Sequence, residues 1–203
     1  MTLKVIAGTA RGRILKTLPQ EDLSVRPMLG RMKKSIFDII QFKVPNSTFI
    51  DLFAGVGSVG IEALSRGAKK VVFAELSNTS LSLIKYNVNM LGFNDKVKII
   101  KCDVIKEFSI LQDKYDIVFM GPPYKDEGKK ALMLTYPTLK NIVRHGILKK
   151  DSVLIAQKHT KEPVGNVIEL ECFRTEKYGD TVISFYMLAK LEPIVTNMAL
   201  SSC

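Results

Sequence analysis

The chain has 203 residues, of which 46% are hydrophobic and 25% charged, so its composition is that of a globular protein and excludes intrinsic disorder. No run of about 18 apolar residues predicts a membrane span, no secretory signal is indicated at the start, and three scattered cysteines predict no disulfide framework. The formal net charge is +10 and there are two histidines, so we expect a cytoplasmic protein that binds a polyanion and has no metal site.

Residues 1–45 form a basic N-terminal segment. Nine of its residues are basic and three are acidic, so it supplies more than half of the net charge of the chain. Such asymmetry is typical of a surface that binds nucleic acid, although a basic surface that only keeps the protein soluble would have the same composition. Its apolar residues are too few for a separate core, so we interpret the segment as an RNA-binding extension of the main domain. The side chains expected to contact phosphates are Arg11, Arg13, Arg26, Arg31, Lys33 and Lys34.

Within this segment the pattern predicts little regular structure. Short strands at 4–7 and 13–16 would form a basic hairpin at most. Residues 31–42 carry apolar side chains at helical spacing, with lysines on the other face, and Pro27 stands before them, where a helix tolerates proline.

Between residues 46 and 190, apolar runs alternate with amphipathic stretches. Strands are expected at 48–53, 70–75, 97–102, 116–120, 152–157, 166–173 and 181–188, and helices at 57–66, 77–91 and 129–145. This alternation predicts a Rossmann-like α/β sheet of parallel strands with right-handed helical crossovers on both faces. The last two strands predict an antiparallel hairpin, and residues 191–203, which show no pattern, are expected to be a disordered tail.

The sequence DLFAGVGSVG, at residues 51–60, leaves the first strand and enters a helix. Gly55 and Gly57 let the backbone turn sharply and approach a ligand closely. Glu75 ends the second strand and Asp103 the third, so with Asp51 three acids are expected at one edge of the sheet. Carboxylates there can accept hydrogen bonds from ribose hydroxyls and from an adenine amino group, which predicts a cofactor that contains adenosine. Each acid alone could instead cap a turn or a helix.

Two adenosine cofactors fit this pattern. Residues 55–60 satisfy G-x-G-x-x-G, with an acid about 20 residues on, so a nicotinamide dinucleotide is allowed. The other is S-adenosylmethionine, which has no pyrophosphate and needs acceptors for hydroxyl and amine groups. The loop after the fourth strand separates the two.

That loop reads GPPY at residues 121–124, and there the chain resembles the bacterial small-subunit rRNA guanine-N2 methyltransferases. The resemblance extends over residues 4–188. Its other motifs are DLFAGVG at 51–57, EALSRGA at 62–68, IAGTARGR at 6–13, Arg26-Pro27 before a basic helix, and YGDTVISFY at 178–186. The resemblance implies a class I methyltransferase fold, S-adenosylmethionine as cofactor, and a guanine of small-subunit rRNA, free or in the assembling subunit, as substrate. We expect the enzyme to be a monomer.

The resemblance also assigns roles to individual residues. The residues expected to hold the cofactor are Asp51, Phe53, Ala54, Gly55, Gly57, Glu75, Asp103 and Val104. The catalytic loop is expected to be Gly121, Pro122, Pro123 and Tyr124, with Tyr124 stacked on a base flipped out of the RNA.

Gly121 departs from the family, whose members begin this loop with Asp or Asn. A guanine amine is a poor nucleophile, because its lone pair is delocalised into the ring, and acceptors at the loop hold its N–H bonds. Gly121 removes the side-chain acceptor, and loss of one preorganised polar contact costs on the order of 10²–10³ in rate. Three explanations remain open: slow turnover, a site that uses backbone or water instead, or an RNA-binding protein that has lost activity. A nicotinamide-dependent oxidoreductase is a further alternative.

Overall fold

The computed structural model describes residues 3–18, 28, 30–126, 128 and 130–190. Arg26, Pro27 and the tail expected at 191–203 lie outside the described residues.

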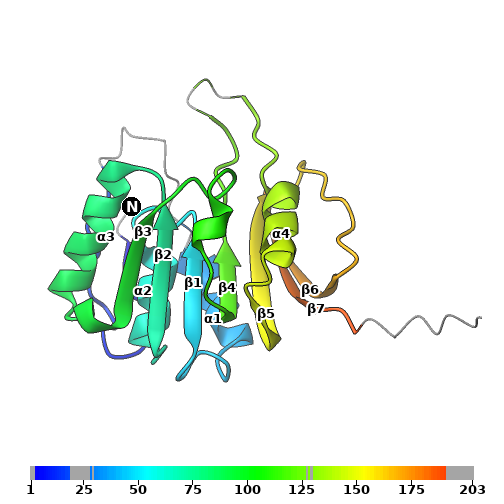
Figure 1. Cartoon of the computed structure of the whole chain (residues 1–203). Coiled ribbons are helices and arrows are strands. Elements are labelled where there is room, and N and C mark those ends of the chain that lie inside the picture. Colours follow the sequence, from blue (N-terminus) through cyan, green and yellow to red (C-terminus); the bar gives the residue numbers. More distant parts are fainter. Residues whose placement is uncertain (1–2, 19–27, 29, 127, 129, 191–203) are drawn as a thin grey trace, which may run out of the picture.

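A seven-stranded sheet forms the centre of the protein (Figure 1). Its order is β3-β2-β1-β4-β5-β7-β6; neighbours from β3 to β5 are parallel, and β7 pairs antiparallel with β5 and β6. The predicted Rossmann-like sheet with its antiparallel hairpin is confirmed. The strands are β1 (Thr48–Leu52), β2 (Lys70–Glu75), β3 (Val97–Lys101), β4 (Tyr115–Met120), β5 (Leu148–His159), β6 (Leu170–Tyr178) and β7 (Thr181–Leu188).

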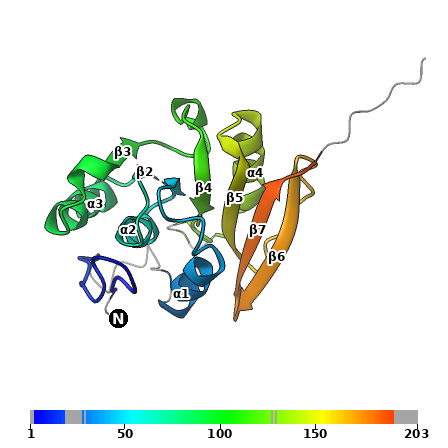
Figure 2. The same ribbon diagram turned by 90° about the horizontal axis from the view of Figure 1, so that it is seen from below.

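Helices cover both faces of this sheet (Figure 2). On one face lie α1 (Gly30–Ile39), α2 (Ser58–Ser65) and α3 (Asn78–Met90); on the other lie α4 (Thr135–Arg144) and the short 3-10 turn η2 (Phe108–Ile110). A second 3-10 turn, η1 (Asn94–Lys96), leads into β3. Each face has its own cluster of buried apolar side chains, so the sheet is buried on both sides, as a parallel sheet requires. None of the helices among the described residues is long and apolar enough to span a bilayer.

The described part of the N-terminal segment packs onto the α1–α2 face. Leu3, Val5 and Leu15 are buried in the same cluster as Phe37 of α1. The two short strands expected here reduce to one antiparallel bridge between Lys4 and Ile14. The segment therefore shares the core of the sheet and has none of its own.

Local signals place several element ends. The Ser77 hydroxyl accepts a 3.3 Å hydrogen bond from Ser80 N and caps α3, as predicted. The hairpin of β6 and β7 turns between Tyr178 and Thr181, which are directly paired, and Gly179 in the turn has φ +58°.

Several predicted elements are wrong in extent. The strand expected at 152–157 is longer, because β5 pairs with β4 from Leu148 and with β7 as far as His159. The helix expected at 31–42 ends at Ile39. The helix expected at 129–145 begins only at Thr135, because Leu132 N donates to Tyr124 O and ties the preceding residues to the GPPY loop, residues 121–124. The strand expected at 166–173 lies at Leu170–Tyr178, because its pairing with β7 continues to the two-residue turn.

Candidate active site

The glycine loop lies beyond the carboxyl end of β1, next to the end of β2. Phe53, Gly55 and Gly57 have φ values of +60°, +54° and +80°, and Ala54 N donates to Ala74 O of β2 at 3.1 Å. A Cβ on Gly57 would lie 3.2 Å from Ile84 and Phe73, so glycine is required there by packing as well as by φ. The loop is therefore held in a left-handed conformation against the sheet, as the sequence pattern predicted.

Gly60 has a different role from the other two glycines. A Cβ on this residue would lie 2.3 Å from Cε1 of Phe73. Gly60 thus allows α2 to pack closely on β2, which fixes the helix behind the glycine loop.

Glu75, at the end of β2, closes this loop. Its Oε2 accepts a 2.7 Å hydrogen bond from Gly55 N, and its Oε1 accepts bonds of 2.8 Å from Leu76 N and Ser77 N. The side chain is half-buried. Three of about four acceptor positions of this carboxylate are in use, so a ribose hydroxyl would find one open and would have to share or displace Gly55 N for a second.

Asp103 lies beyond the end of β3, beside the strand that carries Glu75. Its Oδ1 accepts from Ile105 N at 2.9 Å and from Lys106 N at 3.2 Å, so it also stabilises the turn that follows. Cys102 N donates to Glu75 O at 3.1 Å, which places the adjacent Asp103 next to the end of β2. Burial raises the pKa of the Cys102 thiol to about 11, and the charges of Glu107, Asp103 and Glu75 add to the increase. Cys102 is therefore an inert core residue, and Glu75 and Asp103 lie at one acidic rim.

Asp51 lies beneath the loop. Its side chain is buried, and its Oδ2 accepts a 2.9 Å hydrogen bond from Gly60 N in the first turn of α2. Burial raises the pKa of this carboxyl to about 8; the Gly60 hydrogen bond opposes the shift, and the charge of Glu75 adds to it. The Gly60 contact fixes the first turn of α2 against the end of β1, and the cofactor contact expected of Asp51 stays a prediction.

The apolar residues expected beside the cofactor differ in exposure. Phe53 is half-buried, whereas Ala54 and Val104 are buried, Val104 in the cluster under α4. The positive φ of Phe53 is uncommon for a residue with a large side chain, and strained backbone of this kind is concentrated at functional sites.

The GPPY loop, residues 121–124, follows β4 and lies beside the glycine loop. Gly121 N donates to Leu52 O at 3.4 Å, which joins the end of β4 to the end of β1. Pro122 is buried and Pro123 exposed. The Tyr124 hydroxyl donates to Thr181 Oγ1 at 3.3 Å and accepts from Gln157 Nε2 at 3.0 Å. The structure therefore brings the predicted catalytic and cofactor residues to the same edge of the sheet.

Two residues of this loop's surroundings, Gln157 and Thr181, were missed from the sequence. Gln157 and Thr181 form hydrogen bonds with the Tyr124 hydroxyl. The His159 ring packs edge-on against the Tyr124 ring, with the ring centroids 5.5 Å apart. Gln157 and His159 stand at the end of β5, the next strand along this edge. For Gln157, a place at the end of a predicted strand was the only sequence signal that it belongs to this site.

The basic residues expected to bind RNA divide into two groups. Arg11, Arg13, Arg31 and Lys34 are exposed. The prediction for Lys33 is wrong, because its side chain is fully buried with Nζ 3.2 Å from Glu62 Oε2 and 3.0 Å from Lys4 O. Burial lowers the pKa of Lys33, and the charge of Glu62 opposes that change.

Arg31 and Lys34 line a groove between α1 and β6, and Arg174 of β6 lines its other side. We call this the α1–β6 groove; its remaining lining residues are Ser35, Asp38 and Ile39. Below it the Tyr178 hydroxyl donates to Ser35 Oγ and ties the hairpin to α1. The sequence could not identify Arg174 as part of this groove, because only the folded sheet brings β6 next to α1.

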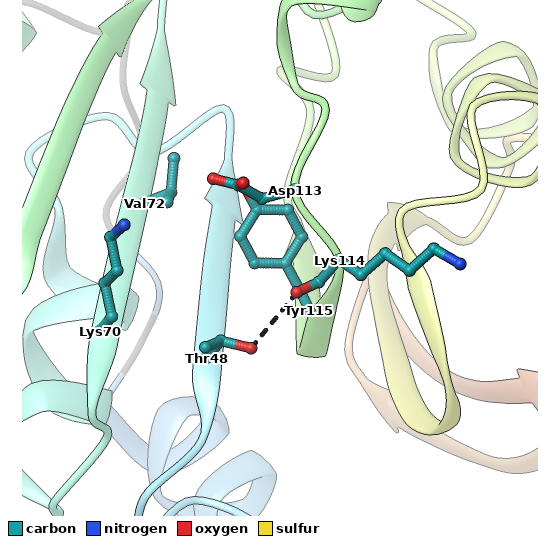
Figure 3. Close-up of a pocket in the computed structure, with 6 residues that line it drawn as sticks. All are labelled: Thr48, Lys70, Val72, Asp113, Lys114 and Tyr115. Carbon is teal, nitrogen blue, oxygen red and sulfur yellow. Dashed lines mark hydrogen bonds between the residues drawn. The ribbon is translucent and has the colours of Figure 1, made fainter.

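A small cavity of about 180 Å³ lies at the opposite edge of the sheet (Figure 3). Thr48 and Lys70, which begin β1 and β2, and Tyr115, which begins β4, line it. The glycine loop and Glu75 lie at the other ends of these strands, so this cavity is not part of the site.

Comparisons with known proteins agree with this geometry. A family model described as Conserved hypothetical protein 95 matches residues 3–187. "Putative rRNA methyltransferase YlbH" of Bacillus subtilis is 29% identical over 188 residues, 91% of this chain and 98% of that protein. "Ribosomal RNA small subunit methyltransferase D" of Haemophilus influenzae is 38% identical over 129 residues, 60% of this chain and 64% of that protein. Among solved structures, "Putative methyltransferase yhhF" from Escherichia coli shares the fold with a TM-score of 0.79 at 21% identity, over 93% of this chain and 98% of that one.

Proposed function

Because the chain belongs to the Conserved hypothetical protein 95 family of S-adenosylmethionine-dependent rRNA methyltransferases, we propose that it methylates the exocyclic N2 of a guanine in small-subunit rRNA. The observation that carries the proposal is the convergence of the glycine loop, Glu75, Asp103 and the GPPY loop at one edge of the sheet. That edge is the place where open α/β sheets bind their ligands.

The residues at this edge fit S-adenosylmethionine. The half-buried carboxylate of Glu75 would accept the ribose hydroxyls, and that of Asp103 the adenine amino group. The left-handed glycine loop brings backbone to the ligand without a Cβ in the way. When bound, the cofactor supplies a methyl group on a positively charged sulfur.

A pyrophosphate fits this loop less well. The Gly60 N–H, in the first turn of α2, is already bonded to the Asp51 carboxyl, so it is not available to a phosphate. This contact, together with the methyltransferase relatives, argues against the nicotinamide alternative.

In the transfer step, this chain orients the reacting atoms and excludes water. Tyr124, fixed by Thr181 and Gln157, would stack on the flipped guanine. A backbone acceptor at residues 121–122 would hold one N–H bond of the 2-amino group, so that its lone pair faces the methyl carbon. No covalent enzyme intermediate is needed, because transfer is a direct displacement that positioning accelerates.

The substrate would approach over the basic surface. Exposed Arg31, Lys34 and Arg174 would hold phosphates in the α1–β6 groove, and exposed Arg11 and Arg13 would make separate phosphate contacts. Arg26 lies outside the described residues, and its role in RNA binding stays a prediction from the sequence.

The proposal is tested by incubating the protein with methyl-labelled S-adenosylmethionine and ribosomal particles from cells that lack its gene. We expect label in the RNA of the small subunit or its precursors and none in the RNA of the large subunit. Label in large-subunit RNA alone would contradict the proposed substrate. Binding of S-adenosylhomocysteine and RNA without any transfer would contradict catalysis and favour the silent RNA-binding protein that Gly121 suggests.

A further inference from the structure

Gln157 stands beside Gly121 on the same face of the sheet. Phe119 of β4 is paired in register with Ile155 of β5, and Gly121 and Gln157 each follow two residues later. Because side chains alternate along a strand, both positions face the α1–α2 side. A Cβ on Gly121 would lie 3.8 Å from Oε1 of Gln157, so the Gln157 amide lies where a side chain at 121 would extend.

The amide of Gln157 is oriented by Tyr124. Its Nε2 donates a 3.0 Å hydrogen bond to the Tyr124 hydroxyl, which itself donates to Thr181 Oγ1. With the nitrogen anchored on Tyr124, the oxygen is the atom that faces Gly121. The side chain is half-buried, so a base placed against Tyr124 could reach it.

The substrate chemistry requires an acceptor at this position. The guanine 2-amino group carries two N–H bonds, and each needs an acceptor once the base leaves water. Gly121 offers no side chain for this purpose. An amide oxygen is a neutral acceptor, so it can orient the 2-amino group without removing a proton from it.

We propose that Gln157 Oε1 accepts a hydrogen bond from the guanine 2-amino group and so supplies, from β5, the side-chain acceptor that Gly121 lacks. This inference rests on the proposed function and adds a catalytic residue to it. In the step, N2 forms a bond to the methyl carbon, and the electron pair of the broken C–S bond stays on sulfur. One N2 proton passes to bulk water when the methylated base leaves the site. Gln157 orients N2 throughout and takes no proton.

The first test measures recognition of the 2-amino group without catalysis. Guanosine and inosine monophosphates, which differ only in this group, are titrated into the protein saturated with S-adenosylhomocysteine. We expect the unaltered protein to prefer the guanosine nucleotide by roughly tenfold, the effect of one hydrogen bond of about 1.4 kcal/mol. Gln157→Ala should lose most of this preference, whereas the exposed control Gln112→Ala should retain it. An equal preference in the unaltered protein and in Gln157→Ala would overturn the inference.

The second test restores an acceptor from the other strand. Gly121→Asn places an amide next to the same position; its Cβ would lie 3.2 Å from the Phe119 ring edge, which requires only a small ring movement. In the Gln157→Ala background, Gly121→Asn should raise kcat by a much larger factor than it does in the protein that retains Gln157. A structural role of Gln157 would give no such rescue, so equal factors in both backgrounds would contradict the inference.

These results separate the inference from the proposed function. Transfer to guanine N2 that is as fast in Gln157→Ala as in the unaltered protein would overturn only the role of Gln157. Transfer by the unaltered protein to another atom would overturn the proposed function itself.

Discussion

The Oε2 atom of Glu75 accepts a 2.7 Å hydrogen bond from Gly55 N, although 20 residues separate them in the sequence. This contact joins the end of β2 to the glycine loop after β1. It means that the carboxylate expected to bind a ribose already holds the loop that would lie against the same ligand. Cofactor affinity and loop conformation should therefore respond together to a change at Glu75.

Glu75→Gln should weaken the binding of S-adenosylhomocysteine by roughly 10- to 100-fold, because hydrogen bonds to a charged group contribute about 1.5–3 kcal/mol. The amide keeps one oxygen that can accept from Gly55 N, so the fold should persist. Calorimetric titration measures the affinity, with exposed Glu171→Gln of β6 as the matched control. Equal affinity in Glu75→Gln and the control would contradict the role given to Glu75.

Gly60→Ala should destabilise the protein by about 1–3 kcal/mol, the usual cost of overpacking, because its Cβ would lie 2.3 Å from the Phe73 ring. Gly30→Ala is the matched control, since a Cβ there meets no atom within 4 Å. Urea unfolding measures both variants. A Gly60→Ala variant as stable as Gly30→Ala would show that α2 can move away from β2 without cost.

The pH dependence of stability should reflect Asp51. Its pKa is raised from 3.8 to about 8 by burial, so the folded state retains a proton that the unfolded state releases between these values. The stability contributed by this proton is fully present below pH 3.8 and is lost as the pH rises through about 8. Its loss amounts to as much as about 1.4 kcal/mol per pH unit.

Asp51→Asn cannot ionise but keeps an oxygen for Gly60 N, so its unfolding free energy should fall less between pH 5 and pH 8.5. Urea unfolding at these two pH values gives the comparison, and Asp95→Asn, at an exposed site in η1, is the control. The same pH slope in Asp51→Asn and Asp95→Asn would contradict the raised pKa.

Arg31→Ala and Arg174→Ala should each weaken binding of small-subunit RNA and reduce the slope of log affinity against log salt by about 0.7 to 0.9, the effect of one lost phosphate contact. Filter binding at several salt concentrations measures the slope. Lys85→Ala, at an exposed position of α3, should leave it unaltered. If Lys85→Ala reduced the slope as much as either arginine variant, the α1–β6 groove would not be the RNA contact.

The sheet and the glycine loop could be predicted because their signals are local. Positive φ at Gly55 and Gly57 and the Ser77 cap follow from residue type and near neighbours. The start of α4 could not be placed, since Leu134 provides no side-chain cap and the residues before it are held by the catalytic loop.

The errors at the site come from partners that are distant in sequence. Lys33 has the helix pattern of an exposed basic residue, but it meets Glu62 of α2 after folding. Gln157 belongs to no recognisable motif. Its place at the site depends on the register between β4 and β5, which brings it next to Gly121. A single sequence does not reveal such a register.

The central claim, methylation of guanine N2 in small-subunit rRNA, is tested most directly by nucleoside mass spectrometry. RNA from small subunits that lack the modification is incubated with the protein and deuterated-methyl S-adenosylmethionine, digested to nucleosides and analysed. Our account predicts that the label appears as N2-methylguanosine. Label on any other nucleoside or on another guanine atom, or an absence of label despite cofactor binding, would contradict it.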